Sequence, residues 1–221
     1  SSLARLSDVV IGLNCGQEIG VAATKSFTAQ LAVLYAIAAR LSPKNVFSQE
    51  FFEPEVVSSA VRTALKNAGQ AKAVASVLKE VQDVYILGRG VHYAIASEAS
   101  LKLKELAYIH AEGLPGGELK HGPLALIDNR SFVILINPTD QTYDDMLKSA
   151  SQVKSRGAKI IGISDTCCAA YDHWLEIPKV RDPYFPFVEI VPIQLLSYHL
   201  AIERNNDPDY PRNLAKSCTT R

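Results

Sequence analysis

Residues 83–90 read DVYILGRG, an apolar run of strand length that ends in a Gly-Arg-Gly turn. Apolar residues at helical spacing follow over 94–108. Strand, glycine turn and helix in this order form the first part of a βα unit, and a nearly continuous apolar run is typical of a buried parallel strand. The stretch therefore predicts an α/β fold.

The same alternation continues toward the C-terminus. Short apolar runs at 132–136, 159–164 and 174–178 alternate with helical patterns at about 144–155 and 186–202. Strands that alternate with helices predict a mainly parallel sheet with helices on both faces. We expect a three-layer αβα sandwich of the doubly wound, flavodoxin-like kind.

The pattern before residue 83 is different. Residues 9–13, VVIGL, form a β-branched run that predicts a short strand, although a strand needs neighbours. A long amphipathic helix is predicted over 24–41, and two shorter helices are predicted within 54–78. We expect a domain boundary between about Leu41 and Gln82.

The composition argues against two classes of partner. The chain has 221 residues, and its 23 basic side chains are balanced by 23 acidic ones, so the electrostatic term that drives non-specific nucleic-acid binding is weak. Its longest apolar runs are shorter than the roughly 20 residues that cross a bilayer. We therefore expect neither nucleic acid nor a membrane as a partner.

Cysteine spacing indicates the compartment. Cys15, Cys167, Cys168 and Cys218 show no CxxC spacing, and the adjacent pair does not close a disulfide easily. Four free thiols favour a reducing compartment, and we expect a cytoplasmic protein. The first residues carry neither an initiator Met nor a targeting pattern, so the sequence is expected to begin within a longer protein.

The Gly88–Gly90 turn lies where open α/β sheets bind ligands, between the end of a strand and the start of a helix. It does not complete the dinucleotide fingerprint, because no acidic residue follows a second strand at the usual distance. A ligand-binding turn and a plain structural turn are both consistent with this pattern.

Three charged residues in the following helix share one face. Glu98, Lys102 and Glu105 are spaced i, i+4 and i+7. An exposed salt-bridge ladder is the ordinary interpretation, and the sequence alone favours it. Apolar residues on the neighbouring faces leave open a second one, in which the surroundings tune the carboxylates for chemistry.

Residues 112–123, EGLPGGELKHGP, are predicted to be a loop that concentrates charged residues. His121 within it is either a surface histidine or part of an active site. His and Cys residues do not occur at metal-ligand spacing, so we expect no metal ion and no cofactor.

Several motifs in the chain occur in one order and spacing: 87–90 (LGRG), 101–105 (LKLKE), 109–112 (IHAE) and 117–127 (GELKHGPLALI). Together they resemble the second sugar-isomerase (SIS) subdomain of the glucosamine-6-phosphate synthases, the isomerising glutamine:fructose-6-phosphate aminotransferases. Two further segments extend the resemblance to nearly the whole chain: 18–28 (EIGVAATKSFT) resembles the late part of the first subdomain, and 211–217 (PRNLAKS) the C-terminal tail.

The resemblance implies a division of the chain into four parts. Residues 1–41 would be the C-terminal remnant of a first SIS subdomain and 42–82 a helical connector. Residues 83–204 would form the second SIS subdomain, and 205–221 a tail that carries an active-site lysine.

It also implies an activity of hexosamine biosynthesis and the residues that perform it. Fructose 6-phosphate and ammonia from glutamine would give glucosamine 6-phosphate. Glu105 would be the general base that moves a proton between C1 and C2 of the sugar. His121 would assist ring opening, and Lys216 would form a Schiff base with the C2 carbonyl.

Further positions are implied to support the site. Lys102 and Glu98 would support the catalytic face, whereas Val21 and Ala215 would line the sugar pocket with their backbone. Implied partners are the glutaminase domain of the full-length protein and a second copy of the chain, because the family pattern is a homodimer in which the equivalent of His121 reaches into the partner's site.

Some family features are absent from the sequence. The main phosphate-binding loop of the first subdomain and the nucleophilic cysteine of the glutaminase would lie before Ser1, so we expect little or no turnover by this chain alone. The ending CTTR at 218–221 differs from the usual Val-Thr-Val-Glu.

Two other functions remain open on the sequence. A non-catalytic phosphosugar-sensing SIS module would need neither Glu105 nor Lys216. Another sugar isomerase or a deglycase of the same fold would keep Glu105 and His121 without needing the segment 213–217.

Overall fold

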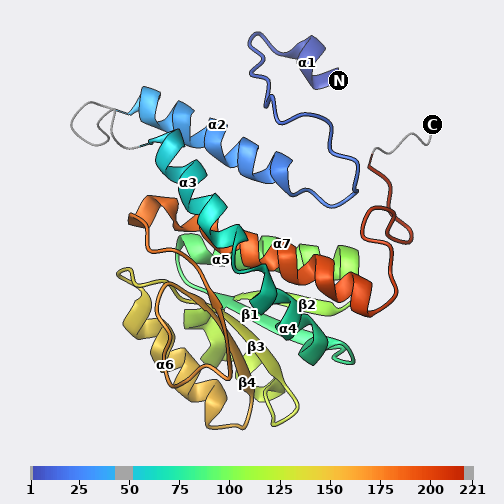
Figure 1. Ribbon diagram of the computed structural model, residues 1–221. Coiled ribbons are helices and arrows are strands. Elements are labelled where there is room, and N and C mark those ends of the chain that lie inside the picture. The colour runs from blue at the N-terminus through green and yellow to red at the C-terminus, as the bar shows by residue number, and fades with distance from the viewer. Residues whose placement is uncertain (1, 43–51, 217–221) are drawn as a thin grey trace.

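The centre of the protein is a five-stranded parallel sheet. A computed structural model describes residues 2–42 and 52–216 (Figure 1). The strands are β1 (Asp83–Gly88), β2 (His110–Pro115), β3 (Phe132–Ile136), β4 (Lys159–Ser164) and β5 (His173–Glu176), in the order β2-β1-β3-β4-β5. Every neighbouring pair is parallel, which confirms the sheet predicted from the sequence.

Strand β2 corrects the loop predicted over 112–123. Its residues pair with β1 from Asp83 opposite His110 to Gly88 opposite Pro115. Because β2 lies at the edge of the sheet, it pairs on one side only and tolerates the Gly and Pro that resemble a loop. The residues after it form two short 3-10 helices, η3 (Gly116–His121) and η4 (Pro123–Leu126).

Helices cover both faces of the sheet (Figure 1). One face is covered by α4 (Ala68–Leu78), α5 (Val91–Lys102) and α7 (Phe185–Glu203), and the other by α6 (Tyr143–Lys154) and η3. Successive side chains of a strand point to opposite faces. In β3, accordingly, Ile134 and Ile136 pack against the first group and Val133 and Leu135 against the second. The predicted three-layer αβα sandwich is confirmed.

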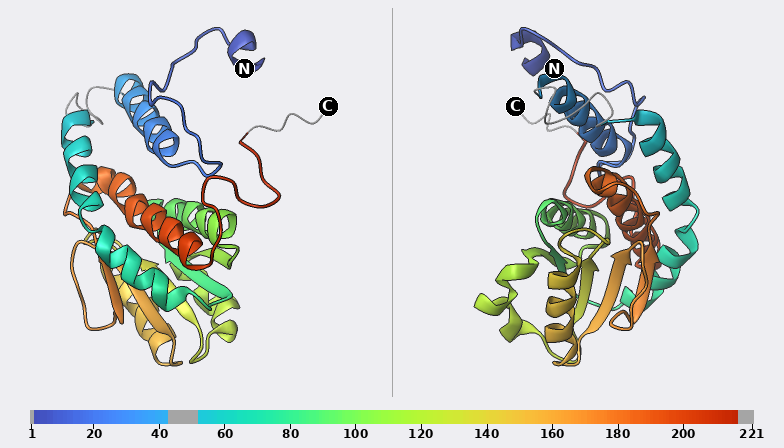
Figure 2. Two further views of the ribbon diagram at one scale, coloured as in Figure 1. Left: turned by 45° about the vertical axis from the view of Figure 1, so that its right-hand side comes forward. Right: turned by 90° about the vertical axis from the view of Figure 1, so that its left-hand side faces the viewer.

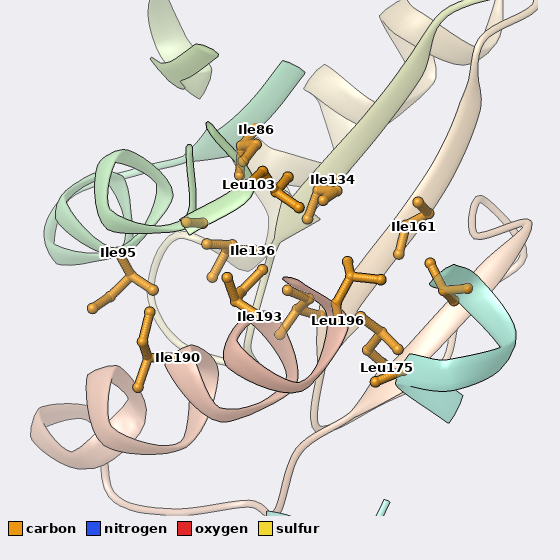
Figure 3. Packing of buried hydrophobic residues seen from close by; sticks show 14 of the residues in the cluster. Ile86, Ile95, Leu103, Ile134, Ile136, Ile161, Leu175, Ile190, Ile193 and Leu196 are labelled. Carbon is orange, nitrogen blue, oxygen red and sulfur yellow. The ribbon is translucent and has the colours of Figure 1, made fainter. Parts of the chain in front are cut away.

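Helix α7, which follows the 3-10 turn η5 (Asp182–Tyr184), is the centre of the larger core. Its residues Ile190, Ile193 and Leu196 lie with Ile134 and Ile136 of β3 in one apolar cluster (Figure 3). Among the described residues, the segment Asp182–Glu203 is long and apolar enough to cross a membrane, but 72% of its apolar window is buried inside the protein. Such burial is what the core helix of a folded domain shows.

The strand predicted at 9–13 does not form. After α1 (Ser2–Leu6) the chain has neither helix nor strand until residue 25, and Val9 and Val10 are 77% and 60% exposed. Strands are held by hydrogen bonds to neighbouring strands. The part of the chain that the structure describes places no strand beside 9–13, so the apolar run lies on the surface without regular secondary structure.

The three helices predicted before the sheet form as α2 (Lys25–Leu41), α3 (Pro54–Leu65) and α4. Helix α2 packs on the core through Phe27 and Tyr35, and the Tyr35 and Phe187 rings lie 5.0 Å apart. Figure 2 shows α1 and α2 at the end of the molecule opposite α6, with the tail after α7 running toward them. The tail thereby reaches the segment before α2, where Lys216 contacts Glu18.

Candidate active site

Glu98, Lys102 and Glu105 form a charge cluster whose central cation is buried. Nζ of Lys102 lies 2.6 Å from Oε2 of Glu105 and 3.3 Å from Oε1 of Glu98. The Lys102 side chain is 1% exposed, and those of Glu98 and Glu105 are 16% and 19% exposed. The contacts are those of the predicted ladder, but an exposed ladder leaves its lysine in solvent. Here the buried ammonium holds two carboxylates in place.

The helix that carries this cluster ends in a π-helical turn. Helix α5 continues as η2 (Leu103–Ala107), and Tyr108 closes it in the left-handed conformation with φ of 56°. Single π turns inside helices are frequent at functional sites. The last carbonyl groups of η2 accept hydrogen bonds from the chain after α7, since Arg204 donates to Ala107 O at 3.0 Å and Asn206 to Leu106 O at 3.1 Å. The C-terminal segment thus fixes the helix end that bears Glu105.

Lys216, the last described residue of the tail, pairs with Glu18. Its Nζ lies 2.6 Å from Oε2 of Glu18 and donates a second bond to Val21 O at 3.4 Å. The Glu18 carboxylate also accepts the Thr24 N–H at 2.9 Å and the Ser26 hydroxyl at 2.5 Å. Burial raises the pKa of Glu18, but these bonds, first that from Lys216, outweigh it and hold the pKa at about 2 instead of 4.5. Lys216 therefore faces an ionised carboxylate at neutral pH.

Val21 and Ala215 lie at this pair. Val21 is half-buried, its N–H donates to Asp209 O at 3.2 Å and its carbonyl accepts from Lys216. Ala215 is exposed and directly precedes Lys216. The structure therefore brings together one segment from each end of the chain. Residues 217–221, including the end of the predicted tail motif, lie outside the described residues.

A groove connects the tail to the buried cluster. It has a volume of about 490 Å³, and its lining includes Glu105 and Tyr108 from the helix end together with Arg212, Asn213 and Leu214 from the tail. Leu214 stands two residues before Lys216. Glu105 and the segment that carries the lysine are thus neighbours in the fold.

His121 is not part of this arrangement. It is exposed at the end of η3, and its side chain forms no hydrogen bond within the described residues. Glu105 lies before strand β2 on the α7 face, whereas η3 follows β2 and packs through Leu119 on the α6 face. The full strand, about 17 Å for its six residues, separates the two positions along the sheet. Within one copy of the chain, His121 and Glu105 therefore lie on opposite faces of the sheet and do not share a site.

The Gly88–Gly90 turn lies at the carboxyl edge of the sheet, as predicted. Charged side chains near it pair with other groups of the same chain. Arg89 pairs with Asp145 of α6 at 3.2 Å. Oδ1 of Asp140, in the loop after β3, accepts the Thr142 N–H at 2.7 Å at the start of α6. A ligand role for this turn stays a prediction.

A buried histidine lies just behind the turn. Nε2 of His92 is 3.0 Å from Oδ2 of Asp140, and Nδ1 is 2.7 Å from Oε1 of Glu189, which is 0% exposed. Burial lowers the pKa of His92, but the two carboxylates, Glu189 first, more than reverse this and raise it to about 9. His92 is therefore a buried cation between two acids at neutral pH.

Glu18 is the one member of the site that the sequence does not single out. It precedes α2, and its bonds to Thr24 and Ser26 are of the kind that caps any helix start. Its partner Lys216 is 198 residues away in the chain. The local sequence shows only an acidic residue before a helix start that contains Thr and Ser. This pattern is common, so it does not identify Glu18 as a site residue.

Comparison with known families finds one matching family model. It is described as the SIS domain and matches residues 77–204, which is more than half of the chain. The match begins within α4 and ends after α7, so it contains the sheet, Glu105 and His121.

Curated relatives align over almost the whole chain. The glutamine–fructose-6-phosphate aminotransferase (isomerizing) of Thermococcus kodakarensis is 43% identical over 99% of this chain, and that of Aquifex aeolicus is 41% identical over 99%. The chain spans only 38% and 37% of the length of these relatives.

Solved structures share the fold. The C-terminal domain of glucosamine-fructose-6-phosphate aminotransferase from Francisella tularensis superposes with a TM-score of 0.88 at 36% identity, covering 95% of this chain and 62% of that one. A glucosamine-6-phosphate deaminase from Thermotoga maritima gives a TM-score of 0.79 at 24% identity, covering 98% and 63%. The second likeness concerns the fold alone.

Proposed function

The chain belongs to the SIS domain family, and from this membership we propose that it is the C-terminal part of the sugar-isomerising half of a glutamine:fructose-6-phosphate aminotransferase. Its substrate would be fructose 6-phosphate, and the product of the whole enzyme glucosamine 6-phosphate. The named relatives support this assignment, since two of them are 43% and 41% identical to the chain.

One observation carries the proposal. A carboxylate held by a buried lysine, Glu105, borders the same groove as the tail segment that ends in Lys216. Aldose–ketose chemistry needs a base fixed beside C1 and C2 of an open-chain sugar. An imine at C2 requires an amine within reach of the same carbon. Glu105 lines the groove, and the tail residues that line its other side lead to Lys216.

The chemistry follows from these two groups. The amine of Lys216 adds to the C2 carbonyl of the open-chain ketose, and loss of water leaves an imine. Ammonia then adds to this imine and expels the Lys216 amine, so the nitrogen on C2 becomes that of ammonia. Glu105 removes a proton from C1 of the resulting imine and returns it to C2, while the C1 hydroxyl loses its proton. This proton transfer leaves an aldehyde at C1 and a nitrogen on a saturated C2. In the resting chain Nζ of Lys216 is held by Glu18, so this contact must open before the amine adds.

Lys102 and Glu98 support the base in this scheme. Nζ of Lys102 fixes the orientation of the Glu105 carboxylate, and Glu98 is the second acidic partner of that lysine. Val21 and Ala215 would line the sugar pocket with their backbone beside Lys216.

His121 would serve the site of a second copy. Its position beyond β2, on the sheet face away from Glu105, supports a homodimer in which His121 of the partner subunit assists ring opening. A site built in this way is incomplete in one protomer.

Other parts of the proposal concern the whole enzyme. The division at 1–41, 42–82, 83–204 and 205–221 into remnant, connector, second subdomain and tail belongs to it, as do a glutaminase domain in the full-length protein and a cytoplasmic location. The chain spans less than two-fifths of its curated relatives, so we expect the substrate's phosphate to be held mainly by residues outside it.

Borohydride trapping tests the function. Fructose 6-phosphate and borohydride are added to the chain and to a longer form that includes the preceding subdomain, and the adduct is located by peptide mass spectrometry. We expect a reduced sugar on Lys216 in the longer form, and none in Lys216→Ala. Lys148→Ala, which removes an exposed lysine on α6, is the matched control and should label normally. Failure of both forms to label would favour the phosphosugar-sensing module.

A further inference from the structure

The tail that carries Lys216 has few contacts after residue 211. Pro211 is buried, but every residue from Arg212 to Lys216 is exposed. Asn213 is in the left-handed region with φ of 63°, and Leu214 N–H reaches back to Pro211 O at 3.4 Å, so these residues form a turn on the surface. Such a turn needs an external contact to hold one position.

Tyr108 provides that contact. Its phenol oxygen accepts the N–H of Arg212 at 2.8 Å, and the Arg212 guanidinium lies over its ring, 4.2 Å from the centroid. The same ring therefore holds both the backbone and the side chain of one tail residue. Stacking of the guanidinium on the ring and the hydrogen bond to the phenol oxygen both stabilise this position of the tail.

The backbone of Tyr108 directs the side chain toward the tail. Its φ of 56° is uncommon for an aromatic residue, and its N–H closes the π turn by donating to Leu103 O. This conformation ends η2 and turns the chain sharply, so the side chain does not continue the helix surface that carries Glu105. Strain of this kind is retained where the surrounding contacts enforce it.

We propose that Tyr108 is a positioning residue that docks the lysine-bearing tail on the end of the helix that carries the base. Glu105 precedes it by three residues in the same π turn, and Lys216 follows its partner Arg212 by four. The contact fixes the distance between imine-forming amine and proton-transferring carboxylate, although it touches neither reacting atom. This inference rests on the proposed function of Glu105 and Lys216.

The first test needs no activity and uses the chain itself. In Tyr108→Phe the acceptor of the Arg212 N–H is lost, and amide hydrogen exchange at Arg212 should become about fivefold faster. Tyr93→Phe, on the exposed side of α5, is the matched control and should leave that exchange unchanged. Equal exchange at Arg212 in all three proteins would overturn the docking contact.

The second test separates positioning from general stability. In the longer form of the protein, Tyr108→Leu should lower kcat and the rate of borohydride trapping at Lys216 together, by about tenfold to a hundredfold, with KM little changed. Tyr108→Phe keeps the stacking face and should recover most of the loss. A Tyr108→Leu protein that traps the sugar at the wild-type rate would overturn the positioning role. Absence of trapping in the wild-type longer form would instead overturn the proposed function.

Discussion

Nζ of the buried Lys102 lies 2.6 Å from Oε2 of Glu105, within the stretch where α5 becomes a π helix. Removing this cation leaves two partly buried carboxylates without a counter-charge. We expect Lys102→Met to lower the free energy of unfolding by about 3 kcal/mol, measured by urea denaturation. Lys104→Met, at the exposed neighbouring position, should change it by less than about 0.5 kcal/mol. Equal losses in the two variants would contradict the buried position of Lys102.

Glu18 should stabilise the fold in a pH-dependent way. Its pKa of about 2 lies below the ordinary 4.5, so its contribution is complete above pH 4.5 and is lost as the pH falls through 2. We expect Glu18→Gln to cost about 1–2 kcal/mol at pH 7, a modest value because Lys216 is 41% exposed. The difference from wild type should begin to shrink below pH 4.5.

Urea denaturation at pH 7, 5 and 3.5 measures this difference. Glu55→Gln is the control, because Glu55 is an exposed acid in the first turn of α3. A cost of Glu18→Gln that stays the same from pH 7 to 3.5 would show that the carboxylate is not held by these bonds.

The buried His92 predicts the opposite pH dependence on the alkaline side. Its pKa of about 9 lies above the ordinary 6.5, so its stabilising contribution is complete below pH 6.5 and is lost as the pH rises through 9. His92→Gln leaves the fully buried Glu189 without its cation, and we expect a cost of about 3 kcal/mol at pH 6. The cost should be smaller at pH 9.5.

Thermal or urea unfolding at both pH values checks this dependence. His110→Gln, which alters an exposed histidine paired with Asp83, serves as the control. If wild-type and His92→Gln proteins differ by the same amount at pH 6 and 9.5, the histidine is not the buried cation described.

A mixing experiment tests whether His121 serves a second subunit. Two inactive variants of the longer protein, His121→Asn and Lys216→Ala, are unfolded together and refolded as a mixture. Half of the resulting dimers carry one of each, and one of their two sites is intact, so about a quarter of wild-type activity should return.

The matched control pairs two variants from the same side of the site. A mixture of Glu105→Gln with Lys216→Ala should stay inactive, because Glu105 lines the same groove as the tail segment that leads to Lys216 of the same chain. Every mixed dimer then has a defect in both sites. Activity in neither mixture, with dimers formed, would place His121 in its own subunit's site.

The sequence predicts the fold well where a strand is itself a nearly continuous apolar run, as in β1, β3 and β4. It mispredicts β2, because the polar and turn-forming residues of HAEGLP fit an edge strand as well as a loop. It also mispredicts the strand at 9–13, since strand formation depends on a neighbour as well as on β-branched residues.

The site was predictable in part for similar reasons. Helical spacing places Glu98, Lys102 and Glu105 on one face, but whether that face is buried depends on packing that no local pattern encodes. The contacts of Lys216 with Glu18 and of Arg212 with Tyr108 join residues 198 and 104 positions apart. Long-range pairs of this kind become visible only in the fold.

The π turn at Leu103–Ala107 has a consequence for how this chain can vary in evolution. Lys102 and Glu105 stand three positions apart, and helical neighbours three or four apart face each other, whereas those two apart do not. Deletion of the intervening Lys104 would convert the pair to a spacing of two and turn the carboxylate away from its cation. Homologous chains should therefore exchange residue types at positions 103 and 104 more readily than they gain or lose a residue there.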